Sequence, residues 1–178
     1  QANAGDIRKR RRRSKSRCGM SIRIHFNSIN MIYTHHNHTQ INPVDYKVGK
    51  MILGPVVGLD FSGVVTHVAK NDTSHAFKVG DEVYGTVRGS LTPYCLVKAS
   101  SISHKPKTLS FAEAAALPTA YLTGFQGLRD HGKLKKDQSV LIVGASGGCG
   151  TAAIQLAKAF GAKTIVGVCS KKNIALVK

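Results

Sequence analysis

The sequence predicts an α/β protein with a β-rich N-terminal part, followed by the beginning of a doubly wound parallel sheet. In residues 139–161, a short apolar run is followed by a glycine-rich turn and then by apolar residues at helical spacing, which end at a glycine. Residues 164–169 form a second apolar run, as a buried parallel strand requires. Residues 43–106 contain short apolar runs between turn glycines, which is typical of a small β-barrel.

The N-terminal half is predicted to be built from strands. Ile22, Ile24 and Phe26 alternate with polar residues and indicate an early strand. Further strands are predicted at residues 56–68 (a glycine-broken pair), 79–87 (after a turn) and 93–97. Residues 33–39 are rich in His and Asn, but no carboxylate or cysteine stands beside them, so we expect no metal site there.

Helices are predicted on either side of Pro118. Ser110 and Glu113 form a capping box, which begins a short helix that Pro118 ends. A second helix is predicted at residues 119–130. Residues 133–138 are a polar connector into the strand at 139–143.

Composition fits a folded protein with one unusual segment. The chain has 178 residues, of which 42% are hydrophobic, enough for one full domain or two incomplete ones. No apolar run reaches membrane-spanning length and no signal-peptide pattern is present, so no membrane partner is expected. The four cysteines lack metal-type spacing, which favours free thiols and a cytoplasmic location: Cys18, Cys95, Cys149 and Cys169.

The basic charge is concentrated near the N-terminus. The formal net charge is +17, and residues 8–17 hold a dense block of arginine and lysine. Self-repulsion predicts that residues 1–20 are disordered. The block is compatible with nuclear localisation, an organelle-targeting segment, a nucleic-acid arm or a non-native N-terminus. Nucleic acid is not the expected partner, because no aromatic residues interleave with the arginines.

The glycine-rich turn at residues 144–150 indicates a dinucleotide-binding site. Glycines let the chain turn tightly, let a pyrophosphate approach the backbone and let the helix pack against the strand. The free N–H groups at the start of the helix then face the phosphate charge. The alternative is an ordinary strand-to-helix turn without a ligand.

The end of the second strand bears on which cofactor binds. An NAD site needs Asp or Glu there to hold the ribose 2′-hydroxyl. This chain has Ser170, Lys171 and Lys172 instead, and a hydroxyl with two ammonium groups suits a 2′-phosphate. The pattern therefore favours NADP(H), the alternative being that both lysines lie on a solvated helix start.

Several motifs together resemble one family. They occur at Asn42–Lys47 (NPVDYK), Gly58–Val65, Phe77–Gly85, Ala114–Pro118, Gly144–Gly150 and Val168–Asn173. Between Asn42 and Lys178 the chain resembles the zinc-free quinone oxidoreductases of the medium-chain dehydrogenase/reductase superfamily. The resemblance implies a GroES-like β-barrel followed by the start of a Rossmann domain, in complete relatives that are often homodimers.

The same resemblance implies NADPH-dependent reduction of a small-molecule quinone or α,β-unsaturated carbonyl by hydride transfer. An enoyl-thioester reductase is the alternative enzyme, and a non-catalytic fragment or nucleic-acid-binding protein is the alternative of another class. Zinc is not expected, because Gly58-Leu59-Asp60 replaces the superfamily's metal-associated G-H-E motif and Cys95 stands alone. Without a Lewis acid, the reaction depends on orienting an already electrophilic acceptor.

Site residues follow from the resemblance position by position. The resemblance implies that the acceptor pocket is lined by Asn42, Tyr46 and Lys47. The alternative for Tyr46 is a packed core aromatic, and the alternative for Lys47 is a surface charge. Asp45 and Asp60 are expected to be structural hydrogen-bond acceptors. For the cofactor it implies Thr123 beside the nicotinamide, Ser146, Gly147, Gly148, Cys149 and Gly150 at the phosphates, and Ser170, Lys171 and Lys172 at the 2′-phosphate.

The predicted organisation has three parts. Residues 1–20 are a disordered basic segment, residues 21–118 a GroES-like catalytic domain, and residues 119–178 the N-terminal part of an NADP-binding Rossmann domain. Relatives run from a strand directly into the NPVD motif, so we interpret residues 31–42 as an insertion, with Asn30 competing for the role of Asn42. A Rossmann domain needs about six strands and this chain supplies two, so we expect a truncated piece that is inactive or poorly soluble when expressed alone.

Overall fold

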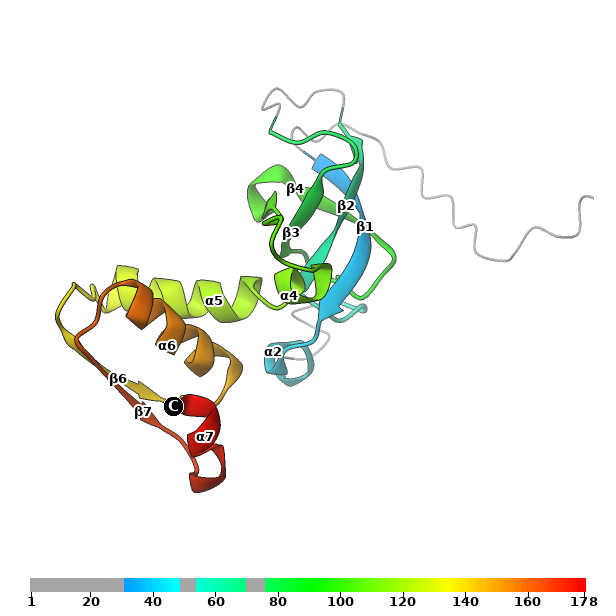
Figure 1. Ribbon diagram of the computed structural model, residues 1–178. Coiled ribbons are helices and arrows are strands. Elements are labelled where there is room, and N and C mark those ends of the chain that lie inside the picture. The colour runs from blue at the N-terminus through cyan, green and yellow to red at the C-terminus, as the bar shows by residue number, and fades with distance from the viewer. Residues whose placement is uncertain (1–30, 49–53, 70–75) are drawn as a thin grey trace, which may run out of the picture.

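A computed structural model describes residues 31–48, 54–69 and 76–178. Its elements form an antiparallel sheet with two short helices, and a smaller unit of two parallel strands beneath a helix (Figure 1). The strands are β1 (Met31–Gln40), β2 (Asp60–Val68), β3 (Glu82–Thr86), β4 (Tyr94–Lys98), β5 (Ile102–His104), β6 (Ser139–Val143) and β7 (Thr164–Val168). The α-helices are α2 (Pro43–Lys47), α4 (Phe111–Ala115), α5 (Pro118–Phe125), α6 (Gly148–Ala159) and α7 (Ile174–Val177).

The antiparallel sheet has the strand order β4-β1-β2-β3-β5. Among the described residues it is an open sheet and not a closed barrel, since no pairing joins its edge strands β4 and β5. The segment that we interpreted as an insertion supplies β1, which pairs with β2 on one side and β4 on the other. The strand predicted around Ile22 lies outside the described residues.

Three local predictions about strands and helices differ in detail from the structure. Residues 56–59 are not part of a strand pair, and Asp60–Val68 forms one strand whose partners are β1 and β3. The short helix predicted before Pro118 ends at Ala115, and Pro118 itself is the first residue of α5, because its missing N–H costs nothing at the first helical position. The helix predicted to reach residue 130 becomes a π-helix over Gln126–His131.

The main core lies within the antiparallel sheet. Six buried apolar side chains from all five strands form it: Ile32, Phe61, Val65, Val83, Val97 and Ile102. The predicted His-rich stretch lies along β1, where His36 stacks on Phe61 at a ring distance of 4.2 Å. Within the part of the chain that the structure describes, no three His, Cys, Asp or Glu side chains gather as a metal site.

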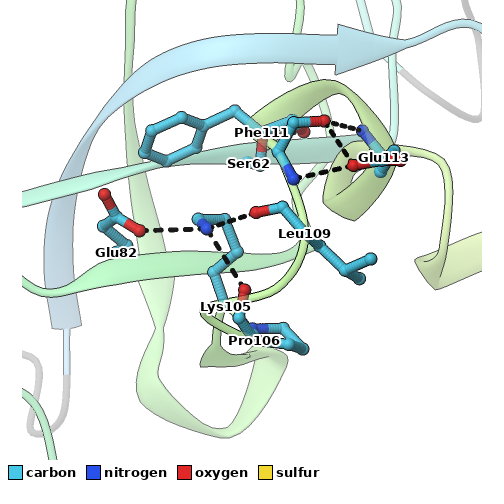
Figure 2. Close-up of polar contacts among 8 residues, drawn as sticks. Ser62, Glu82, Lys105, Pro106, Leu109, Phe111 and Glu113 are labelled. Atoms are coloured by element: carbon cyan, nitrogen blue, oxygen red, sulfur yellow. Dashed lines mark hydrogen bonds and ion pairs between the residues drawn. The ribbon is translucent and has the colours of Figure 1, made fainter.

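Lys105 stabilises the loop between β5 and α4 through its side-chain ammonium group (Figure 2). Its side chain is 5% exposed, and its Nζ donates to the carbonyls of Pro106 and Leu109 and pairs with Glu82 Oε2 at 3.0 Å. The Ser110–Glu113 capping box then begins α4, as predicted. Ser62 Oγ on β2 donates to the Phe111 carbonyl at 2.6 Å, so the start of α4 is held against the sheet.

The helix α5 connects the two units, and α6 packs alongside it (Figure 1). Gly124 permits this close approach, because a Cβ atom at that position would lie 3.3 Å from the backbone nitrogen of Ala153. Tyr121 also donates to Gln155 Oε1 at 2.8 Å across the two helices. None of the described helices has the length and apolar character needed to cross a membrane.

Candidate active site

The glycine-rich turn joins the end of β6 to the start of α6. Gly144 has φ +76°, the left-handed region that favours glycine, and its N–H and that of Ala145 both donate to the Val168 carbonyl at 3.0 Å. A Cβ atom at Gly150 would lie 2.2 Å from the Gly144 carbonyl oxygen. Thus Gly144 makes the turn, while Gly150 lets α6 pack against it.

The middle of the turn leaves the backbone open. A Cβ atom at Gly148 would meet nothing within 4 Å, and one at Gly147 would meet only the Gly144 carbonyl oxygen at 3.4 Å. Because α6 begins at Gly148, the N–H groups of its first turn have no carbonyl partner within the helix. An anionic group can therefore approach these donors, and the turn fits the pyrophosphate of a dinucleotide.

The chain after β7 lies next to this turn. Ser170, Lys171 and Lys172 are exposed, and neither lysine forms an ion pair with any residue that the structure describes. Asn173 Nδ2 donates to Ser146 Oγ at 3.0 Å. The structure thus brings together two predicted groups of cofactor residues that are more than twenty positions apart in sequence.

Cys149 is an exposed free thiol in the first turn of α6. Thr123 is exposed on α5, one helical turn beyond Thr119.

The second part of the site is a hydrogen-bond network around Asp60, which is fully buried at the start of β2. Asp60 Oδ2 accepts from Asn42 Nδ2 at 2.8 Å and from the Thr119 N–H at 3.1 Å, and Oδ1 accepts from the Thr119 hydroxyl at 2.7 Å. Asp60 therefore joins the loop before α2 to the first turn of α5. This confirms its expected role as a structural acceptor.

Burial raises the pKa of Asp60, because removal from water disfavours the charged carboxylate, and the donors from Thr119 and Asn42 oppose that rise. Asp45 is also buried, and its Oδ2 accepts the Asn42 N–H at 2.7 Å in a capping box at the start of α2. Asn42 is therefore held at both its backbone and its side-chain amide.

The other predicted acceptor-pocket residues are solvent-facing. Tyr46 is 67% exposed, which excludes a packed core aromatic, and Lys47 is exposed on the same short helix. Neither residue lines either of two cavities, of about 550 Å³ and about 380 Å³, in the described part of the chain. The larger, of about 550 Å³, lies between β3, β5 and α5, where Tyr84, Tyr121 and Phe125 contribute to its walls.

Two residues of this site were not found by sequence reasoning. Thr119 follows the proline that was taken as a helix end, so its two hydrogen bonds to Asp60 were not anticipated. Asn173 belongs to a quoted motif, but no local pattern indicated its contact with Ser146, which lies 27 positions earlier.

The fold agrees with comparisons to known proteins. Residues 20–126 match the family described as the alcohol dehydrogenase GroES-like domain. The chain is 40% identical over 156 residues to the 2-methylene-furan-3-one reductase of Solanum lycopersicum, covering 78% of this chain and 39% of that protein. It is 41% identical over 130 residues to the NAD(P)H oxidoreductase RTN4IP1, mitochondrial, of Mus musculus, covering 68% of this chain and 32% of that protein.

A solved structure shares the fold over most of the chain. The quinone oxidoreductase from Coxiella burnetii superposes with a TM-score of 0.74 at 31% identity, covering 84% of this chain and 51% of that one. The chain therefore belongs to the alcohol dehydrogenase GroES-like family of the medium-chain dehydrogenase/reductase superfamily, a superfamily of oxidoreductases. It spans about half the length of that solved structure and less of the two curated relatives.

Proposed function

We propose that this chain belongs to an NADPH-dependent reductase of quinones or α,β-unsaturated carbonyls. Its residues would orient the acceptor and bind the phosphates of the cofactor. The glycine turn carries the proposal, because it leaves bare backbone at Gly147 and Gly148 beside the unpaired N–H groups of α6. Two relatives support the reaction class by their names. One is named a 2-methylene-furan-3-one reductase, and that substrate name denotes an alkene conjugated to a ketone; the solved structure is named a quinone oxidoreductase.

The preference for NADPH rests on the residues after β7. Lys171 and Lys172 are exposed cations without an ion-pair partner in the described part of the chain, and no carboxylate follows the strand. A 2′-phosphate is a strong acceptor for such groups, whereas a ribose 2′-hydroxyl is best held by a carboxylate.

The chain's own residues would bind and orient the reactants. The N–H groups at the start of α6 would hold the pyrophosphate, and Ser170 with the two lysines would hold the 2′-phosphate. When bound, the nicotinamide supplies the hydride. Asn42 donates its side-chain N–H to Asp60, and this hydrogen bond fixes the position from which Asn42 would orient the acceptor or the nicotinamide amide.

The cofactor part is tested by fluorescence titration of the 178-residue chain with NADPH and NADH. We expect selective NADPH binding, and a loss of about tenfold or more in NADPH affinity for Lys172→Ala with NADH unchanged. Lys158→Ala is the matched control, because Lys158 is an exposed lysine at the other end of α6. Equal binding of both nucleotides by the wild type would contradict the proposed selectivity.

The acceptor part is tested on the protein expressed from its full reading frame. NADPH oxidation is followed with a quinone, an enone and an enoyl thioester in parallel. Turnover with the first two supports the proposal, whereas turnover restricted to the thioester identifies the alternative enzyme, an enoyl-thioester reductase.

A further inference from the structure

The side chain of Asn173 has an unusual use. Asn173 immediately precedes α7, where an asparagine ordinarily caps the helix, yet its side chain makes no cap hydrogen bond. It reaches instead to Ser146, in the turn between β6 and α6, and donates from Nδ2 to Oγ at 3.0 Å. Both residues are half-buried, so the contact is shielded from water more than a surface pair would be.

This contact determines what the Ser146 hydroxyl can do. A serine hydroxyl has one proton to donate and two lone pairs to accept. Because Asn173 donates to one lone pair, the O–H proton is left for another acceptor. Ser146 directly precedes Gly147, the residue that caps α6, so its hydroxyl lies at the same turn as the helix N–H groups.

We propose that Asn173 is a positioning residue of the cofactor site, which holds the Ser146 hydroxyl as a donor to the dinucleotide pyrophosphate. This inference rests on the proposed function. It assigns Asn173 to the phosphates that NADPH and NADH share, whereas Lys172 is assigned to the 2′-phosphate. Asn173 therefore affects affinity for both nucleotides, and Lys172 affects selectivity between them.

The backbone supports this arrangement. The Gly144 and Ala145 N–H groups donate to Val168 at the end of β7, so the turn and the segment after β7 are joined before Asn173 adds its side-chain contact. A change at Asn173 can thus release the Ser146 hydroxyl while the turn keeps its main-chain hydrogen bonds.

The test is a double-mutant cycle read by NADPH and NADH dissociation constants for the 178-residue chain. We expect Asn173→Ala and Ser146→Ala each to weaken both nucleotides by a similar factor of about three to ten. The double variant should be no weaker than Ser146→Ala alone, because Asn173 acts through Ser146. Additive losses, or a loss for NADPH only, would overturn the positioning role.

Asn173→Asp is the decisive companion variant. Aspartate has nearly the same shape and also suits the position before a helix. When ionised, however, it can only accept hydrogen bonds, so the Ser146 O–H would donate to it and would no longer be available for the pyrophosphate. We expect a larger loss than for Asn173→Ala, with an unchanged unfolding temperature. Affinity equal to that of the wild type would overturn the inference.

The wild-type titration separates the two hypotheses. Failure of the wild type to bind either nucleotide overturns the proposed function and the role of Asn173 with it. Wild-type binding that neither Asn173→Ala nor Ser146→Ala weakens overturns the role of Asn173 alone.

Discussion

Asp60 shows how one buried side chain can organise two parts of a site. It accepts hydrogen bonds from Asn42, a predicted acceptor-pocket residue, and from Thr119 in the first turn of α5. Thr123 lies one helical turn further along, at the spacing that places two residues on the same helix face. Asp60 therefore links the residue proposed to orient the acceptor to the helix that carries the proposed nicotinamide contact.

At the residue scale, Thr119→Val should destabilise the chain by about 1.5–3 kcal/mol, the cost of losing a hydrogen bond to a buried carboxylate. Burial already raises the pKa of Asp60, and loss of the Thr119 hydroxyl removes a group that lowers it. A carboxyl whose pKa is raised in the folded state contributes stability below its unfolded pKa, and that stability is lost as pH rises through the folded pKa. The destabilisation should therefore be larger at pH 7 than near pH 4.

Urea unfolding of Thr119→Val and the wild type at both pH values measures this difference. Thr123→Val is the matched control, because Thr123 lies on the same helix, is exposed and makes no described hydrogen bond to Asp60. A cost for Thr119→Val that stays constant with pH would show that the ionised carboxylate does not depend on this hydroxyl.

At the scale of elements, the strand–turn–helix unit assigns different tasks to its glycines. Gly150→Ala would place a Cβ atom 2.2 Å from the Gly144 carbonyl oxygen and 2.8 Å from the Ala145 Cα, so backbone must move. We expect a loss of about 1–3 kcal/mol or more in the free energy of unfolding. Gly148→Ala meets nothing within 4 Å and should leave stability unchanged or slightly raised.

Thermal unfolding followed by NADPH titration distinguishes these roles. Gly148→Ala should retain the fold but weaken nucleotide binding, because its methyl group occupies the space through which a pyrophosphate approaches the backbone. A Gly148→Ala variant that binds NADPH as well as the wild type would contradict the proposed approach of the phosphates.

At the scale of the whole molecule, the parallel unit is covered on one face only. Ile142 is buried beneath α6, whereas its neighbours Leu141 and Val143 are 63% and 76% exposed. The parallel register pairs them with Val166 and Val168, which are also exposed, so the four side chains form one open apolar face. Large open apolar faces associate in water.

We therefore expect the 178-residue chain to self-associate, and Leu141→Glu with Val143→Glu to reduce that association in sedimentation velocity measurements. Ile142→Glu is the control, because a charge on the covered face should destabilise the unit rather than solubilise it. Association that is unaffected by the double substitution would place the contact elsewhere on the molecule.

The sequence by itself determined the features that short-range physics dictates. Glycine spacing, the apolar run before it and the helical spacing after it identified β6, the turn and α6, and the Ser110–Glu113 spacing identified the cap of α4. Each depends on residues only a few positions apart, where turn geometry and helix hydrogen bonding decide the conformation. The family motifs identified the general fold in the same way.

Only the tertiary structure decided which distant residues meet. Asn42 and Thr119 both contact Asp60, although they lie 18 and 59 positions from it in the sequence. Asn173 likewise contacts Ser146, which lies 27 positions earlier. The place of Met31–Gln40 between β2 and β4 in the sheet was likewise a matter of pairing partners. Local patterns specify whether a residue is in a strand, helix or turn, whereas strand register and helix packing specify what its side chain touches.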